Sequence, residues 1–194
     1  MKKTFLIIAT FSLCMVAFTG KTMAQKTFKK GTKVVNVGIG LGSTLGGYGY
    51  STSVPPISVS LDWGIIDNLF NVDKLSLGVG GYLGYSANKW VETYGSYEWG
   101  YKYSYIIPGA RGTIHYEIMD KFEGYGGLML GYNIVSGKEI GDWNYYYGNY
   151  NHTDSYVQFS AFVGARYYFA DAFGAWAELG YGIAYFNLGL SLKF

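Results

Sequence analysis

Residues 186–194 read Phe-Asn-Leu-Gly-Leu-Ser-Leu-Lys-Phe, so that every second residue is large and apolar. The residues between them are Asn187, Gly189, Ser191 and Lys193. Successive side chains of a β-strand point to opposite faces. This stretch therefore predicts a strand with one apolar face and one polar face.

The same period of two recurs in seven earlier segments of the chain. Their apolar positions fall in the ranges 35–41, 57–63, 75–83, 101–116, 128–134, 157–167 and 175–181. Most segments have about the 9 to 11 residues that a tilted strand needs to cross a bilayer. An even set of antiparallel strands closes without leaving a sheet edge in lipid.

The polarity of the two faces separates a membrane barrel from a soluble one. A soluble eight-stranded barrel of the lipocalin kind has a wet outer face. Here one face is aliphatic or aromatic and the other is Gly, Ser, Asn and charge, while only 14% of all residues are charged. In water that apolar face would be a very large exposed patch. The sequence predicts an all-β fold, an eight-stranded antiparallel up-and-down transmembrane β-barrel.

The fourth segment is irregular. In the range 101–105 the tyrosines occupy odd positions, whereas beyond Pro108 the apolar residues Ile114 and Tyr116 occupy even ones. Proline lacks a ladder donor and is tolerated at bulges. The pattern therefore predicts a β-bulge near Pro108.

The first 24 residues have the pattern of a secretory signal peptide. Lys2 and Lys3 precede an uncharged run over 4–20, and the small-residue site 22–24 follows. We expect residues 1–24 to be removed and residues 25–194 to form one outer-membrane barrel domain. The leader would take with it the single cysteine and three of the 15 basic residues, leaving 12 against 13 acidic ones. No basic field remains to suggest a nucleic-acid partner.

The connections follow the pattern of bacterial barrels, whose periplasmic turns are short and whose external loops are longer. With the first strand running outward, the predicted external connections are 43–55, 86–100, 135–154 and 183–184, and the periplasmic ones are 65–74, 117–121 and 169–173.

Three runs carry a resemblance to a known family: Arg-Gly-Thr-Ile-His-Tyr at 111–116, Gly-Gly-Leu-Met-Leu-Gly-Tyr-Asn at 126–133 and Gly-Leu-Ser-Leu-Lys-Phe at 189–194. The mature chain resembles the outer membrane protein β-barrel domain family of small OmpA-, OmpX- and OmpW-like eight-stranded, porin-like barrels. This resemblance implies localisation in the outer membrane of a Gram-negative bacterium. It also implies that Phe194 ends a signal read by the barrel-assembly machinery.

Charged residues on the polar faces are expected to point into the lumen. They are Asp62, Arg111, His115, Arg166, Glu178 and Lys193. Because an isolated ion in a low-dielectric lumen is costly, we expect a network of ion pairs in which Glu178 bridges Arg166 or Arg111. The alternative is that these pairs gate a narrow pore or small-molecule conduit.

The predicted external loops are rich in aromatic residues. These are Trp90, Tyr94, Tyr97, Trp99, Trp143, Tyr145, Tyr146, Tyr147 and Tyr150. One interpretation is an interfacial aromatic belt. The other is a recognition surface for an extracellular glycan or protein, since Tyr with Gly, Ser and Asn is adaptable binding chemistry.

The sequence predicts no enzyme, metal site or cofactor. His152, Asp154 and Ser155 contain the residue types of a hydrolytic site, but consecutive strand residues point to opposite faces and a triad is defined by geometry. The two histidines have no metal-ligand spacing around them. We therefore expect a membrane-embedded protein with a structural or surface-interaction role, whose partners are outer-membrane lipid, the assembly machinery and an extracellular ligand.

Overall fold

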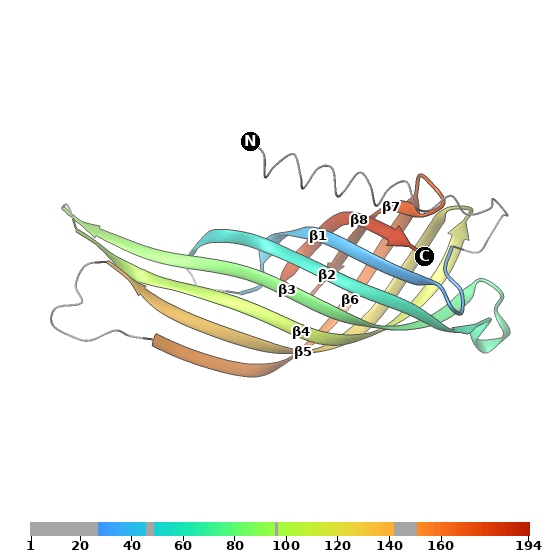
Figure 1. The fold of residues 1–194 in the computed structure, drawn as a ribbon, viewed down its shortest axis with the longest axis horizontal. Coiled ribbons are helices and arrows are strands. Elements are labelled where there is room, and N and C mark those ends of the chain that lie inside the picture. The colour runs from blue at the N-terminus through green and yellow to red at the C-terminus, as the bar shows by residue number, and fades with distance from the viewer. Residues whose placement is uncertain (1–26, 46–48, 96, 142–150) are drawn as a thin grey trace, which may run out of the picture.

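A computed structural model describes residues 27–45, 49–95, 97–141 and 151–194. Its eight antiparallel strands form one closed barrel, in which each strand pairs with its neighbours in sequence and β8 returns to β1 (Figure 1). The predicted fold class is thus confirmed. The strands are β1 (Lys33–Ser43), β2 (Ser51–Asp67), β3 (Leu75–Tyr94), β4 (Tyr97–Met119), β5 (Phe122–Ile140), β6 (Asn151–Tyr168), β7 (Phe173–Gly180) and β8 (Ala184–Lys193), with a short 3-10 turn, η1 (Leu69–Asn71), between β2 and β3.

The strand register fixes the tilt of the barrel. From Asn36 on β1, the directly opposed residues lead through β2, β3, β4 and β5 to Gln158 on β6. In the other direction they lead through β8 and β7 to Tyr168 on β6. The two routes end ten residues apart, and a stagger of this size requires strands tilted by about 40°.

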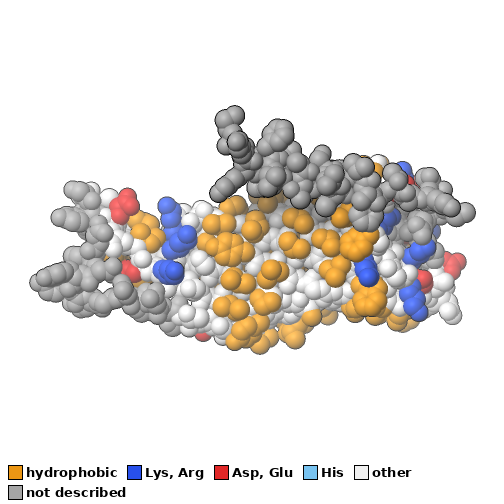
Figure 2. Space-filling view, viewed as in Figure 1, with side chains coloured by type: hydrophobic (Ala, Val, Ile, Leu, Met, Phe, Trp, Pro, Cys, Tyr) orange, Lys and Arg blue, Asp and Glu red, His pale blue; other side chains and the backbone are white. Residues whose placement is uncertain are grey.

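The outward face carries a belt of apolar side chains (Figure 2). Leu128, Leu130, Val163 and Leu190 are all more than half exposed. Larger rings lie toward the two ends of the belt: Trp63, Tyr116, Tyr167 and Phe194 on the side of the C-terminus, and Tyr132, Tyr181 and Tyr185 on the other. An apolar band between aromatic girdles is the surface of a barrel that spans a bilayer.

None of the helices in the described part of the chain is both long and apolar enough to cross a membrane.

The predicted bulge at Pro108 is wrong. Along β4 the pairing with β3 continues without a shift, and Pro108 lies opposite Leu83. Tyr105 and Ile107 are buried and Ile106 is exposed, so the odd positions face inward on both sides of the proline. The missing donor interrupts the pairing with β5 only locally, between Ile106 and Gly109, and leaves the register unchanged. The tyrosines before Pro108 therefore face inward, whereas the sequence pattern predicts that they lie on the outward, apolar face.

The irregular strand is instead β2. Its register with β3 shifts twice between Thr52 and Ile57, and again between Gly64 and Ile66. Pro55 lies in the first of these regions, which β1 does not cover, since β1 pairs with β2 only as far as Ile57. Proline at an exposed strand edge removes a donor that would otherwise lack a partner.

The strands on one side are longer than predicted. The range 86–100, predicted as a loop, is paired strand up to the hairpin end at Tyr94 and Tyr97. β5 likewise continues to Ile140 and remains paired with β4. Figure 1 shows β3, β4 and β5 reaching far beyond the short β7 and β8. The parts of β3 to β6 that extend past the end of β7, at 86–94, 97–104, 134–140 and 151–156, are called the projecting sheet below.

A glycine on β3 leaves room for a charged side chain of β2 to contact a charged side chain of β4. Gly80 lies directly between Asp62 on β2 and Arg111 on β4 in the strand register. A Cβ at this position would lie 1.7 Å from the carbonyl oxygen of Leu61. Gly81 faces outward, and a Cβ there would meet nothing nearer than 4.0 Å.

We expect Gly80→Ala to destabilise the barrel by about 1–3 kcal/mol, because the added methyl group overpacks against backbone that cannot move independently. Gly81→Ala is the matched control and should change the free energy of unfolding by less than about 0.5 kcal/mol. Urea unfolding of both variants in lipid vesicles measures this difference. Equal stability of the two variants would show that the close approach of β2 and β3 at Gly80 is wrong.

Candidate functional site

Asp62 is the centre of the charge network inside the barrel. Its Oδ1 lies 3.2 Å from Nε of Arg111, and its Oδ2 lies 3.0 Å from Nη2 of Arg166. The side chain is fully buried and also accepts a hydrogen bond from Nδ2 of Asn36. One carboxylate on β2 thus joins an arginine on β4 to an arginine on β6.

Each arginine has a second carboxylate partner. Nη2 of Arg111 lies 3.0 Å from Oε2 of Glu178 on β7, and Arg166 forms a close ion pair with Glu123 on β5. Glu178 contacts Arg111 and not Arg166, and Asp62 is the carboxylate that contacts both arginines. With these pairs, the network ties together five of the eight strands.

Aromatic rings cover the guanidinium groups. The Arg111 guanidinium lies 4.0 Å from the ring centre of Phe162, and that of Arg166 lies 4.9 Å from the ring centre of Tyr125. Desolvated arginine is attracted to the face of such rings. Lys193 makes a similar contact, 4.4 Å from the ring centre of Tyr168.

Glu123 is a member of the network that the sequence analysis missed. The predicted fifth segment has its apolar positions at 128–134, and Glu123 lies before it. Glu123 has the same odd parity as Tyr125 and Met129, both of which are buried in the lumen. Extending the alternation by one step would have placed its carboxylate inside. His115 lies next to it, with Nδ1 3.7 Å from Oε1 of Glu123 and Nε2 2.9 Å from the hydroxyl of Thr113.

Residues that precede β1 close the lumen at the end where β1 begins and β8 ends. The Phe28 ring stacks on His115 with 3.7 Å between ring centres, and only 4% of Phe28 is exposed. Its carbonyl oxygen accepts a hydrogen bond from Ser76, and backbone hydrogen bonds join Gly31 and Thr32 to Gly64. These bonds fix the segment across the opening.

The opposite end of the lumen is closed by an apolar cluster. Leu45, which follows β1, packs with Tyr105, Ile107, Ile183 and Ala184, and all five are buried. Nδ2 of Asn88 donates a 2.6 Å hydrogen bond to the carbonyl oxygen of Leu45 and so holds the connection inside the mouth.

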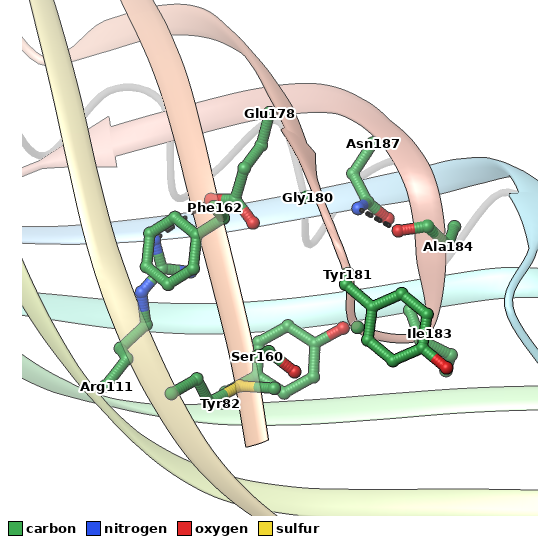
Figure 3. Close-up of a pocket in the computed structure, with 12 residues that line it drawn as sticks. Tyr82, Arg111, Ser160, Phe162, Glu178, Gly180, Tyr181, Ile183, Ala184 and Asn187 are labelled. Carbon is green, nitrogen blue, oxygen red and sulfur yellow. Dashed lines mark hydrogen bonds and ion pairs between the residues drawn. The ribbon is translucent and has the colours of Figure 1, made fainter. Parts of the chain in front are cut away.

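A small cavity remains between this cluster and the charge network (Figure 3). Arg111, Glu178 and Phe162 line one side, and Tyr82 and Ile183 line the other. The space open to the centre of a water molecule is about 20 Å³, and one buried water needs roughly 10–15 Å³. The cavity has room for about one water and none for a larger solute.

The second candidate site lies on the projecting sheet. Trp90 packs edge-on against Trp99, with 5.5 Å between ring centres, and the rings continue through Tyr101 and Tyr103 to Tyr50 at separations of 5.3, 6.4 and 5.8 Å. These five residues are called the aromatic ladder. Nε1 of Trp99 donates a 3.0 Å hydrogen bond to Glu139 on β5.

The ladder lies on the inner face of the projecting sheet. Trp99, Tyr101 and Tyr103 have the same parity on β4 as the buried Tyr105, and Trp90 lies opposite Tyr101 in the register. Above the closed mouth this face is half-exposed. The expected aromatic loop at Trp90 and Trp99 is therefore a concave, strand-borne surface.

The other predicted loop aromatics are not placed in the same way. Tyr94 and Tyr97 pair at the end of the β3–β4 hairpin. Trp143, Tyr145, Tyr146, Tyr147 and Tyr150 lie outside the described residues.

The possible metal ligands of the described ranges are dispersed. No group of three or more His, Cys, Asp or Glu side chains gathers there at metal-binding distance. At the candidate hydrolytic set, the carboxylate of Asp154 accepts a hydrogen bond from the backbone amide of Ser155, and these two neighbours on β6 have opposite parity.

Known proteins resemble this chain in structure but not in sequence. Neither the family models nor the curated proteins gave a match. Among solved structures, the fold is similar to Ail, the attachment invasion locus protein of Yersinia pestis, in complex with the heparin analogue sucrose octasulfate. The identity is 12% and the TM-score 0.51, over 85% of this chain and 99% of that one.

Two further solved structures have lower scores. The N-terminal β-barrel domain of Pseudomonas aeruginosa OprF is 12% identical with a TM-score of 0.45, over 86% of this chain and 98% of that one. Neisserial surface protein A is 14% identical with a TM-score of 0.41, over 84% and 94%. The similarity to Ail shows that the chain has the fold of a small eight-stranded outer-membrane barrel.

We expect Arg111→Met to lower the free energy of unfolding by about 3–5 kcal/mol, because it leaves Glu178 and one oxygen of Asp62 buried without their partner. Adding Glu178→Gln should recover part of the loss, with a coupling of about 0.5–3 kcal/mol. Urea unfolding in vesicles measures this cycle. Arg111→Met combined with Glu98→Gln, a change on the exposed end of β4, is the uncoupled control, and coupling of the same size in both cycles would contradict the ion pair.

Proposed function

We propose that this protein is an integral outer-membrane protein of a Gram-negative bacterium that acts at the cell surface, with the barrel as a closed anchor and the projecting sheet as a recognition surface. The observation that carries the proposal is the aromatic ladder on the half-exposed inner face of strands that continue past the apolar belt. A barrel that served only as a membrane anchor would not need strands that extend beyond the lipid.

The filled lumen supports a surface role over the alternative of a narrow gated conduit. Phe28 blocks one end and the cluster around Leu45 blocks the other. Between them, three carboxylates alternate with two guanidinium groups, and the cavity beside them has room for about one water.

The route to the membrane is part of the same proposal. We infer that residues 1–24 are a cleaved signal peptide and that the last strand is read by the barrel-assembly machinery. The outward side chains Leu188, Leu190 and Phe194 support this, because they present an apolar face along β8. The backbone of Phe194 pairs in both directions with Lys33 on β1, so the recognised strand is also the one that closes the barrel.

The chemistry of the ladder favours an extracellular glycan or a glycan-bearing protein as ligand. Tyr and Trp provide flat apolar area at low entropic cost together with hydrogen-bonding groups. The solved structure of Ail contains a heparin analogue, which supports testing sulfated glycans on this chain.

In planar bilayers, the folded protein should give no steady single-channel current, since both ends of the lumen are blocked. A heat-modifiable band on SDS gels, compact before boiling, confirms that the protein measured is folded. Any steady current from the folded protein would overturn the closed-anchor proposal, and a change of that current in Glu178→Gln would assign it to a conduit gated by the ion pairs.

The recognition role predicts that Trp90→Ala with Trp99→Ala lowers binding at least about tenfold, the loss expected when two aromatic anchors worth at least 1 kcal/mol each are removed. The protein in nanodiscs is tested on an array of extracellular glycans and matrix proteins that includes heparin. Tyr181→Ala removes an exposed ring at the β7–β8 turn and is the control. Binding that survives loss of both tryptophans would remove the aromatic ladder as the recognition surface, and a parent protein that binds nothing on the array would leave only a structural role.

A further inference from the structure

Three lysines form a row across the outer face of the projecting sheet. Lys102 on β4 lies directly opposite Lys89 on β3 and directly opposite Lys138 on β5. Directly opposed residues point to the same face, and their parity is that of the outward residues Leu83, Ile106 and Leu130. Neighbouring strands are about 4.8 Å apart, so the row is about 10 Å long.

Such a row is unfavourable without a counter-charge. Like charges directly opposite each other destabilise a sheet. Within the described residues none of the three ammonium groups has an ion pair. The outward positions two residues away along the strands are Ala87, Val91, Gly100, Ser104, Ser136 and Ile140, and none of these carries an acid.

The height of the row places it beside lipid headgroups. Tyr85, Ile106 and Ile134 form the last row of large apolar residues below it, four residues away along each strand. Four residues of a strand tilted by about 40° rise by about 10 Å. Headgroup layers extend about 5–8 Å beyond the hydrocarbon, and lysine side chains reach several ångströms along a surface. Figure 2 shows basic side chains beyond the apolar belt on this side.

We propose that Lys89, Lys102 and Lys138 form a binding site for the phosphate groups of an anionic glycolipid in the outer leaflet. The proposal rests on the outer-membrane location proposed above but not on the aromatic ladder, which lies on the opposite face of the same strands. Adjacent ammonium groups on a rigid sheet hold one phosphate between two of them, and the row is long enough for a headgroup that carries two phosphates.

Lipid A is the probe, since it is a disaccharide lipid with phosphates at both ends. Protein is purified from mixed micelles of phosphatidylcholine and lipid A, and the lipid A retained per barrel is measured by mass spectrometry. The triple variant Lys89→Gln, Lys102→Gln, Lys138→Gln should retain about tenfold less, within the gain expected for three lysines near an anionic surface. Dephosphorylated lipid A should show no preference over phosphatidylcholine, and excess inorganic phosphate should not displace lipid A.

Two control variants separate the row from charge in general. Replacing the same three residues by arginine should preserve retention. Replacing Lys30, Lys33 and Lys74 at the other end of the barrel by glutamine should change it less than twofold. Equal retention by the row variant and the parent would overturn the site. A compact unboiled band on SDS gels in that case would leave the membrane barrel intact, so the two failures are distinguishable.

Discussion

The structure depends on one constraint, which is that no backbone amide or carbonyl group of a spanning strand can be left without a partner in lipid. The pairing of β8 with β1, from Val34 opposite Lys193 to Ser43 opposite Ala184, satisfies this constraint by removing the last free edge. Closure with eight strands and a ten-residue stagger then fixes a narrow interior. Every charge inside it must therefore meet a partner, because the cavity beside the network has too little room for water to hydrate it.

The interior satisfies that requirement with alternating signs. Asp62 lies between two arginines, and each arginine reaches one further carboxylate, Glu178 or Glu123. Gly80 on β3 leaves space for Asp62 on β2 to contact Arg111 on β4. A lumen filled in this way, with Phe28 at one end and the Leu45 cluster at the other, gives the barrel wall a packed interior.

The sequence predicts the structure well where lipid enforces a pattern. The eight strands and their two faces are predictable because lipid tolerates only apolar side chains, and inward charges follow from parity. Past Ser86 the alternation on β3 breaks at Ala87 and Asn88, which are both buried. On β4 it continues, since Trp99 and Tyr101 alternate with Gly100 and Lys102, so the extension of this strand before residue 101 is predictable from the sequence. Phe28 and Leu45 lie in irregular segments, where no periodicity indicates that a side chain turns inward. The large rings of the tyrosines before Pro108 suggest side chains that face lipid. Tyr105 is instead buried in the mouth of the lumen.

The wall of the barrel is higher on the side of β3 to β6 than on the side of β7 and β8. β7 and β8 end low, at the turn where Tyr181 donates its amide to Ala161, while β3 to β6 continue outward. The inner face of the projecting sheet consequently has neither β7 nor β8 opposite it. If that face is the recognition surface proposed above, a long chain lying flat on the cell surface would reach the aromatic ladder from the low side of the wall.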